Sequence, residues 1–599
     1  MEFGQKAEEK KMSMSKNIAR LAVTAGLTAA LSFGGVMAPV TMAFAAEGAV
    51  TTTNSITINK IAGNKNVKYK AYQIFKAKVT DTAKGKTAQD ITWTNDELGA
   101  TVVNAIKSNW TGYNDLAENK QLPDNPTAQE VADFLMANAG STTAGSPDGS
   151  SEGTRLETDN VLYAVANAVK DHASAVDGAD TGDAWTFSAQ NGSGYYLFVT
   201  SDLDSKKPNT GTSPIFAIVG GNPVTVTEKT SIPTINKEVL NVKESKDGYT
   251  AQKGWSNVAD SQVGQEVSYK LTGSIADNYA TYDSYAYKFT DTLSQGLTYV
   301  DDSLEVYALN DGGYTKISPN SYTLVEPTES NNVLTVNFDK EKGLKSATAA
   351  NADETLNIGA ETKIVVFYKA KLNSKASYEA TGNGNKNEVY LEYSNNPMAG
   401  GTGKSETKVV TDYVFGFDVT KVDEGTGDPL KGDEKLQAGF KVRVVEGDED
   451  TLKDKWLGAN GEIVDSEHAH EFMTKANTGK VFIPGLDAGT YEITETTTPS
   501  GYNTIAPFQI TVKPDYDTAG NLTGLTVSDT SNMVDSEKTN ASIDSTKIPV
   551  TIKNKKGSGL PLTGLNGVTF TWIAGGAVLC IGVAHLIRGR KRAEESEQE

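Results

Sequence analysis

Short segments in which apolar and polar residues alternate fill most of the chain after residue 230. Turn-forming pairs such as Asp247-Gly248 and Asn460-Gly461 separate them. Alternation with a period of two is the pattern of a half-buried strand, because successive side chains point to opposite faces of a sheet. At 599 residues the chain is also too long for one hydrophobic core. Several β domains in series are therefore expected.

The region before residue 230 carries helical signals as well. Thr127 followed by Glu130 forms a capping-box pattern, and Gly140 can end the helix that it starts. Apolar residues also recur at helical spacing between Val161 and Val169. The expected fold is mainly β, with three tandem immunoglobulin-like β-sandwich domains, the first of which has added helices.

The composition excludes several classes of function. The chain has 76 Asp and Glu residues against 56 Lys and Arg and a formal net charge of −20. Nucleic-acid binding needs a clustered positive surface, and no basic run interrupts the expected domains. No phosphate loop, dinucleotide fingerprint or nucleophile elbow occurs. His468 and His470 could share a face, but they lack a third metal ligand, so a solvated loop is favoured. We expect no nucleic acid, no metal, no cofactor and no enzymatic activity on other molecules.

The N-terminal residues 1–45 have the order of an export signal. Basic residues up to Arg20 precede an apolar stretch over residues 21–36, which is short for a membrane span. Small residues follow, and the pattern Ala43-Phe44-Ala45 predicts cleavage after Ala45. A buried amphipathic helix is the weaker alternative.

The C-terminal end has three consecutive parts. The first is the pentapeptide Leu560, Pro561, Leu562, Thr563 and Gly564. A mostly apolar run over residues 565–587 follows; as a helix it would extend about 34 Å, enough to cross a bilayer. The basic cluster 588–592 would then stay cytoplasmic by the positive-inside rule.

This order resembles the cell-wall sorting signal of Gram-positive surface proteins. The resemblance implies that a sortase, a separate transpeptidase, cuts between Thr563 and Gly564 and joins the Thr563 carbonyl to an amine. The only cysteine, Cys580, lies in the segment that sorting removes. The exported product, about residues 46–563, would therefore have no disulfide to stabilise it.

Polar side chains occupy faces that the alternation assigns to the core. Three sets share the parity of apolar neighbours on predicted strands: Phe417, Val419 and Lys421; Tyr491, Ile493 and Glu495; Val550, Ile552 and Asn554. A buried unpaired ammonium or carboxylate is strongly disfavoured. A covalent solution is available, because a desolvated Lys421 can lose its proton and attack the Asn554 carboxamide. A protonated Glu495 would polarise the carbonyl and shuttle protons, and ammonia would leave.

The segments 418–423, 489–502 and 551–555 resemble the collagen-adhesin B-type domains of Gram-positive pilins. The resemblance implies Lys421 and Asn554 as an isopeptide-bonded pair and Glu495 as the catalytic acid. The family's usual Ala before Pro is Thr498 here. The alternative is a buried salt bridge between lysine and glutamate, with an incidental asparagine.

A second set of the same residue types occurs in the middle region. The alternation places Lys237, Asp291 and Asn387 on inward faces. The stretches around Asp291 and Asn387 resemble the isopeptide-forming D2 domain of fimbrial backbone subunits, which implies Asp291 in the acid role. Asn385 and Asn395 have the same parity as Asn387, so the acceptor stays open. Asn387 is favoured because it opens the apolar alternation.

The first region offers only fragments of such a set. Lys60 shares a face with Ile56 and Ile58, and Asn222 shares one with Ile218. No acid lies convincingly between them, so a third bond stays an open alternative.

Polymerisation by a sortase also requires a lysine that faces outward. Val224 and Val226 are predicted to point inward, so Lys229 points outward. Pilin families commonly carry Tyr-Pro-Lys at this place, where this sequence has Thr-Glu-Lys. Lys229 is the expected linkage residue, and Lys206, Lys207 or an ordinary surface role for Lys229 are the alternatives.

The chain is accordingly divided into an export signal (1–45), an N-terminal pilin domain (46–230), a middle D2-type domain (231–410), a C-terminal collagen-adhesin B-type domain (411–559) and a sorting signal (560–599). The resemblance implies a backbone subunit of a sortase-assembled pilus, secreted and covalently anchored to peptidoglycan. Its implied partners are a pilus-specific sortase, identical subunits and ancillary pilins. The alternative is an ancillary, tip or singly anchored adhesin that binds a host surface ligand.

Overall fold

The computed structural model describes residues 54–82, 85–139, 156–189, 192–201, 203–240, 248–380, 384–447, 452–534 and 545–557. The expected export and sorting signals lie outside these residues. Within the described part of the chain, no helix combines the length and apolar character needed to cross a membrane.

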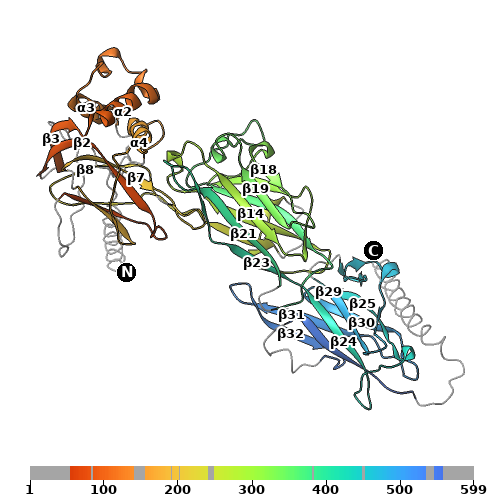
Figure 1. Cartoon of the computed structure of the whole chain (residues 1–599). Coiled ribbons are helices and arrows are strands. Elements are labelled where there is room, and N and C mark those ends of the chain that lie inside the picture. The colour runs from red at the N-terminus through yellow and green to blue at the C-terminus, as the bar shows by residue number, and fades with distance from the viewer. Residues whose placement is uncertain are drawn as a thin grey trace, which may run out of the picture.

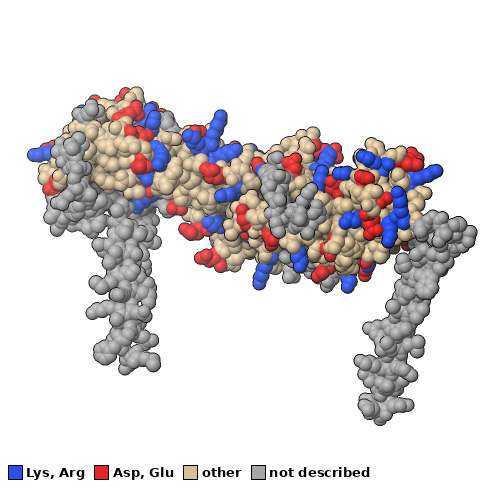
Figure 2. All heavy atoms as spheres, turned by 90° about the horizontal axis from the view of Figure 1, so that it is seen from below, with Lys and Arg blue, Asp and Glu red and all other residues tan. Residues whose placement is uncertain are grey.

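Three groups of β-sheets follow one another along an elongated molecule (Figure 1). The expected fold class is confirmed: the chain is mainly β, and the described α-helices all lie in the first domain. Acidic and basic side chains are interspersed along the face shown in Figure 2, so neither sign dominates that face.

The N-terminal domain contains two sheets. Their strand orders are β5-β6-β1-β9 and β3-β2-β7-β8, with β4 pairing to β2. The strands are β1 (Ser55–Asn59), β2 (Lys68–Thr82), β3 (Gly85–Trp93), β4 (Val176–Asp177), β5 (Ala179–Asp180), β6 (Ala184–Ser188), β7 (Gly194–Ser201), β8 (Ile215–Val219) and β9 (Val224–Thr227). Trp185, Phe187 and Phe198 pack between the sheets. Strands β1 and β9, at the two ends of the domain, pair in parallel.

Three helices form a further layer on this domain: α2 (Asp96–Asn104), α3 (Ala128–Asn138) and α4 (Val161–Val169). The predicted capping box is present, since the Thr127 side chain accepts from the Glu130 N–H and the Glu130 carboxylate accepts from the Thr127 N–H. The helix runs to Asn138, and the expected stop at residue 140 lies outside the described residues. Leu135 and Val165 join the core between the helices and the sheet.

The middle domain is a sandwich of two larger sheets. Their orders are β11-β10-β13-β20-β16-β17, with β15 on β20, and β12-β23-β21-β14-β19-β18, with β22 on β21. The strands are β10 (Ile235–Leu240), β11 (Trp255–Ser256), β12 (Val258–Asp260), β13 (Glu266–Ser274), β14 (Tyr287–Leu293), β15 (Leu297–Tyr299), β16 (Glu305–Asn310), β17 (Gly313–Lys316), β18 (Thr323–Val325), β19 (Val333–Phe338), β20 (Lys363–Leu372), β21 (Asn385–Ser394), β22 (Thr402–Lys404) and β23 (Lys408–Tyr413). Strand β23 still belongs to this sandwich, so the chain leaves the middle sheets a few residues after 410.

The C-terminal domain has a small sheet, β29-β24-β33, facing a larger one, β27-β26-β25-β30-β31-β32, with β28 on β25. The strands are β24 (Phe415–Asp423), β25 (Gly439–Glu446), β26 (Trp456–Leu457), β27 (Ile463–Val464), β28 (Phe472–Met473), β29 (Lys480–Leu486), β30 (Gly489–Thr497), β31 (Phe508–Tyr516), β32 (Leu522–Asp529) and β33 (Lys547–Asn554). Its first and last strands, β24 and β33, lie side by side in parallel, with Lys421 opposite Ile552.

The junction between the first two domains is interlocked. Residues 395–401 of the middle domain, here called the docking segment, reach the N-terminal domain, where Met398 is buried in the core beneath the helices. The Asn395 side chain donates to Asn209 Oδ1 at 2.8 Å, and the Asn396 side chain donates to the Thr200 carbonyl at 3.3 Å. These contacts fix the two domains against each other.

Aromatic side chains join the middle and C-terminal domains. Tyr413 stacks on Tyr516 with ring centroids 5.5 Å apart, and Tyr378 meets the edge of Phe482 at 4.9 Å. The Tyr378 hydroxyl also accepts from the Gly485 N–H at 2.8 Å. At both junctions the domains are therefore held by contacts between side chains as well as by the peptide chain that connects them.

Candidate cross-linking sites

In the C-terminal domain, three predicted residues converge from two facing sheets. Lys421 lies on β24 and Asn554 on the adjacent parallel strand β33, two positions beyond the register partner of Lys421. This offset of two keeps both side chains on the inner face. Glu495 reaches them from β30 in the facing sheet. All three side chains are buried.

Hydrogen bonds close these three groups into a triangle. The Lys421 ammonium contacts Asn554 Oδ1 and lies 2.9 Å from Glu495 Oε1. The Asn554 amide nitrogen donates to Glu495 Oε1 at 2.9 Å and to Oε2 at 3.1 Å. The carboxyl group therefore touches both the amine and the nitrogen that would leave.

Electrostatics at this site favours a reactive amine. Burial lowers the pKa of Lys421 to about 8, against the opposing attraction of the Glu495 charge. Roughly a tenth of such a group is uncharged at pH 7. Thr498, the residue that departs from the family pattern, places its hydroxyl 3.5 Å from Glu495 Oε2, where it adds one weak contact.

The middle domain has a similar but not identical arrangement. Lys237 on β10, Asp291 on β14 and Asn387 on β21 are all buried between the two sheets. The Lys237 ammonium contacts Asp291 Oδ2. Desolvation lowers the pKa of Lys237 and raises the pKa of Asp291, while the attraction between their charges opposes both shifts. Because desolvation is the larger effect, it brings the neutral pair closer in energy to the charged pair.

A fourth residue, Tyr368 on β20, completes the middle site. Its hydroxyl accepts from the Asn387 amide at 2.5 Å and from Lys237 Nζ at 3.3 Å, and it donates to Asp291 Oδ2 at 3.2 Å. Sequence reasoning missed it because Tyr368 has the parity of Val366 on a buried strand, which is the ordinary pattern of a core aromatic residue.

The structure separates the three possible acceptors. Asn387 is the one that contacts Tyr368. The Asn385 side chain bonds to the backbone of Ser377 and to the Asp412 carbonyl, where it holds a loop. The Asn395 side chain is engaged at the junction with the N-terminal domain.

In the N-terminal domain, Lys60 and Asn222 do not meet. The Lys60 ammonium lies 2.8 Å from Asp180 Oδ1, whereas Asn222 is exposed and its N–H donates to Asp81.

Sequence reasoning also missed Glu228. This buried carboxylate accepts from the Ile61 N–H, from the Asn64 side chain and from the Tyr69 hydroxyl.

The candidate linkage lysines lie near the junction of the first two domains. In strand β9, Val226 is buried and Thr227 is exposed, while Val224 and Thr225 are both partly buried. Lys229 follows it, is partly buried, and its backbone N–H donates to Thr212 Oγ1 at 3.2 Å. Lys206 and Lys207 are exposed in a loop whose backbone bonds to β22. The sorting pentapeptide lies outside the described residues.

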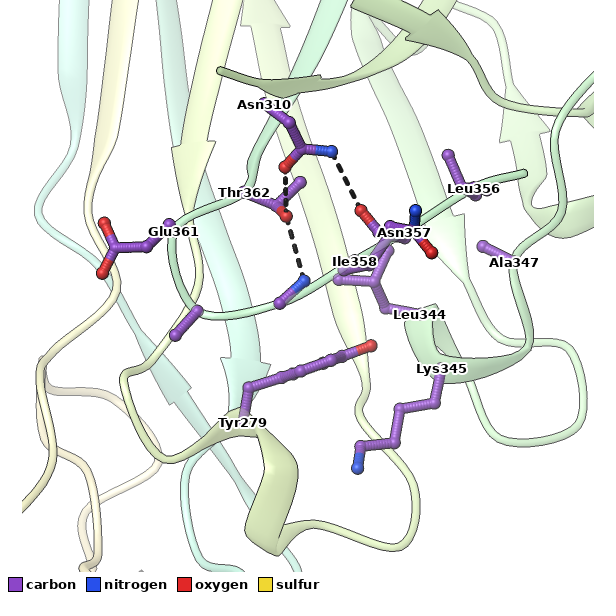
Figure 3. A pocket seen from close by; sticks show the side chains of 12 residues that line it. Tyr279, Asn310, Leu344, Lys345, Ala347, Leu356, Asn357, Ile358, Glu361 and Thr362 are labelled. Atoms are coloured by element: carbon purple, nitrogen blue, oxygen red, sulfur yellow. Dashed lines mark hydrogen bonds between the residues drawn. The ribbon is translucent and has the colours of Figure 1, made fainter. Parts of the chain in front are cut away.

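A cavity of about 780 Å³ in the middle domain is separate from these sites (Figure 3). Leu344, Leu356 and Ile358 give it an apolar wall, and the Lys345 ammonium lies 4.9 Å from the centre of the Tyr279 ring. Partial burial lowers the pKa of Lys345.

Across the residues that the structure covers, no group of three or more His, Cys, Asp or Glu could hold a metal ion.

Comparison with known proteins gives one family match and many similar structures. Residues 416–524 match the family described as SpaA, prealbumin-like fold domain. No curated protein matches the chain.

Over most of its length the chain is similar in fold to backbone pilins of Gram-positive bacteria. The T6 backbone pilin of Streptococcus pyogenes is 16% identical, with 85% of this chain and 100% of that chain covered and a TM-score of 0.47. The major pilin SpaD from Corynebacterium diphtheriae is 15% identical, with 84% and 98% covered and a TM-score of 0.41. The group B streptococcus pilus 2b backbone protein is 23% identical, with 50% and 97% covered and a TM-score of 0.36.

Proposed function

We propose that this chain is the structural backbone subunit of a covalently polymerised surface pilus. In this proposal Thr563 of one subunit is joined by a pilus-specific sortase to Lys229 of the next. The last subunit is joined to peptidoglycan, and ancillary pilins share the fibre. The ordered signals at the two chain ends support export and sorting, and the serial β domains suit a shaft.

The observation that carries the proposal is the buried contact between Lys421 and Asn554. The chain enters the C-terminal domain at the start of β24 and leaves it at the end of β33. Because these strands are parallel neighbours, a pull along the shaft acts on opposite ends of the pair. An amide bond between Lys421 and Asn554 would tie the two strands near the end of β33, so the chain between these two residues could not extend.

The same reasoning covers the middle domain. We infer that Lys237 and Asn387 form the second bond, with Asp291 in the acid role. Lys237 lies on β10 near the domain entrance and Asn387 on β21, which is close to its exit. Both bonds would form without another enzyme. In this proposal the chain is itself a substrate of the sortase, and its role in the fibre is mechanical.

Co-expression with the cognate pilus sortase tests polymerisation. The wild-type chain is expected to give a ladder of high-mass products that resists boiling in detergent, and Thr563→Ala is expected to abolish it. Lys229→Arg is expected to abolish it as well, with Lys207→Arg as the matched control that leaves it intact.

Two results would change the proposal. A ladder that persists in Lys229→Arg and disappears in Lys206→Arg or Lys207→Arg moves the linkage to the exposed loop. Absence of a ladder from the wild-type chain, with wall anchoring retained, overturns the shaft role in favour of a singly anchored protein.

A further inference from the structure

The two buried sites differ in how the acid reaches the asparagine. In the C-terminal domain the Glu495 carboxylate contacts the Asn554 amide nitrogen directly, at 2.9 and 3.1 Å. In the middle domain the acid is Asp291, whose side chain is one methylene shorter. The Asn387 amide nitrogen donates to the Tyr368 hydroxyl instead.

The Tyr368 hydroxyl is the one group that contacts all three others. It lies 3.3 Å from Lys237 Nζ, 3.2 Å from Asp291 Oδ2 and 2.5 Å from the Asn387 amide nitrogen. The Asn387 side chain also lies near the Tyr269 hydroxyl, since burial raises the pKa of Tyr269 and a hydrogen bond with Asn387 opposes this rise. It is the nitrogen that would leave, Nδ2, that contacts Tyr368.

Packing holds this hydroxyl in place. Tyr368 is fully buried on β20, which is paired on both sides by β13 and β16. Its ring stacks on Tyr269 with centroids 5.2 Å apart. A side chain fixed in this way loses little further freedom when the reaction occurs.

We propose that Tyr368 is a catalytic residue of the middle domain, which relays a proton between Asp291 and the leaving nitrogen of Asn387. This inference rests on the proposed function, because it requires that the bond between Lys237 and Asn387 forms. It assigns to the pair of Asp291 and Tyr368 the task that Glu495 performs alone in the C-terminal domain.

The reaction starts from the Lys237 ammonium and the Asp291 carboxylate. Lys237 gives one proton to Asp291, and the neutral amine attacks Cγ of Asn387. Asp291 passes that proton to the Tyr368 oxygen while Tyr368 gives its own to Nδ2, so the bond from Cγ to Nδ2 breaks and ammonia leaves. The second proton lost by Nζ goes to the Asp291 carboxylate and is then released, which restores Asp291 and Tyr368. The products are an amide, ammonia and one proton.

The electrostatics of Tyr368 fits a relay and not a free base. Burial, followed by the nearby Asp291 charge, raises the pKa of Tyr368 well above its ordinary value. The phenol therefore keeps its proton at neutral pH, and it can move one proton only by receiving another.

The test follows bond formation in time after cell-free synthesis of the exported chain, residues 46–563, with quenching and peptide mapping. Tyr368→Phe keeps the ring and removes the hydroxyl. It is expected to slow the middle-domain bond about a hundredfold, the lower end of the usual contribution of proton transfer. The C-terminal bond in the same molecules should keep its wild-type rate.

Tyr287→Phe is the matched control. Tyr287 is equally buried in the middle core, and its hydroxyl donates to the Ser274 carbonyl, away from the site. Folding is followed separately by protease resistance of the middle domain. Slow bond formation in a domain that has folded at the wild-type rate supports the relay.

Results that overturn the proton relay can be told apart from a result that overturns the cross-link itself. A wild-type rate in Tyr368→Phe overturns the relay and leaves the proposed function standing. Slow bond formation that only tracks slow or failed folding also overturns it, since Tyr368 is then structural. If the wild-type chain contains no bond between Lys237 and Asn387, the proposed cross-link itself is wrong.

Discussion

Lys421 and Asn554 are separated by 133 positions in the chain, yet their side chains meet across two parallel strands. The first and last strands of the C-terminal domain are thereby neighbours, and the contact lies in an apolar core with Glu495 against both residues. In the middle domain, Lys237 and Asn387 are also buried, and Asp291 and Tyr368 contact them. These contacts lead to four predictions beyond those made above.

The first prediction concerns mass. The exported chain, residues 46–563, is expected to weigh less than the sum of its residues by two molecules of ammonia. Peptide mapping should find Lys237 joined to Asn387 and Lys421 joined to Asn554. A mass equal to the simple sum, with both lysines open to amine-reactive reagents after denaturation, would falsify the cross-links.

The second prediction concerns stability of the C-terminal domain. Asn554→Ala removes the acceptor and leaves the buried Lys421 and Glu495 paired. The free energy of unfolding is expected to fall by about 4–5 kcal/mol, because an open chain loses the entropic benefit of the closed loop. Lys553→Ala, on the exposed face of the same strand, is the control and should change little. Urea titration with protease resistance as the readout measures both.

The third prediction concerns pH. In Asn554→Ala, Lys421 keeps a titratable amine whose pKa burial lowers from 10.5 to about 8. The unfolded chain then binds more protons than the folded chain between these values, so stability from this group rises as pH increases from about 8 to about 10.5. In the cross-linked wild type, the nitrogen of Lys421 is part of an amide, so Lys421 does not titrate and does not make the stability depend on pH. The stability gap between wild type and variant should therefore narrow over this range, and a constant gap would count against the buried free amine.

The fourth prediction concerns the docking segment. Met398→Ala removes a buried side chain from the core of the N-terminal domain and is expected to cost about 2–5 kcal/mol at this junction. Small-angle scattering should show a wider spread of angles between the first two domains. Met136→Ala, at an exposed position of the same domain, is the control. An unchanged scattering profile would show that the segment does not hold the junction.

The sequence allowed the strand faces to be predicted where alternation is long. Lys421, Glu495 and Asn554 each follow several apolar residues of the same parity, so their convergence could be expected from the pattern alone. The capping box at Thr127 is equally local. A pattern formed by residues that are close together in the sequence can be recognised before the three-dimensional structure is known.

Other features depend on contacts that alternation does not encode. Tyr368 has the pattern of an ordinary core residue, and its role is visible only when three other strands are placed around its hydroxyl. Lys60 meets Asp180 because a two-residue strand lies beside β6, and so short a strand has no pattern to recognise. Met398 enters a neighbouring domain, which no periodicity within its own domain could indicate.

The burial of Met398 in the N-terminal core has a consequence for the proposed export. A chain that crosses a membrane from its N-terminus would present the first domain early, whereas Met398 would follow only after most of the middle sandwich. In that case the packing beneath the helices of the first domain could be completed only when this later segment arrives.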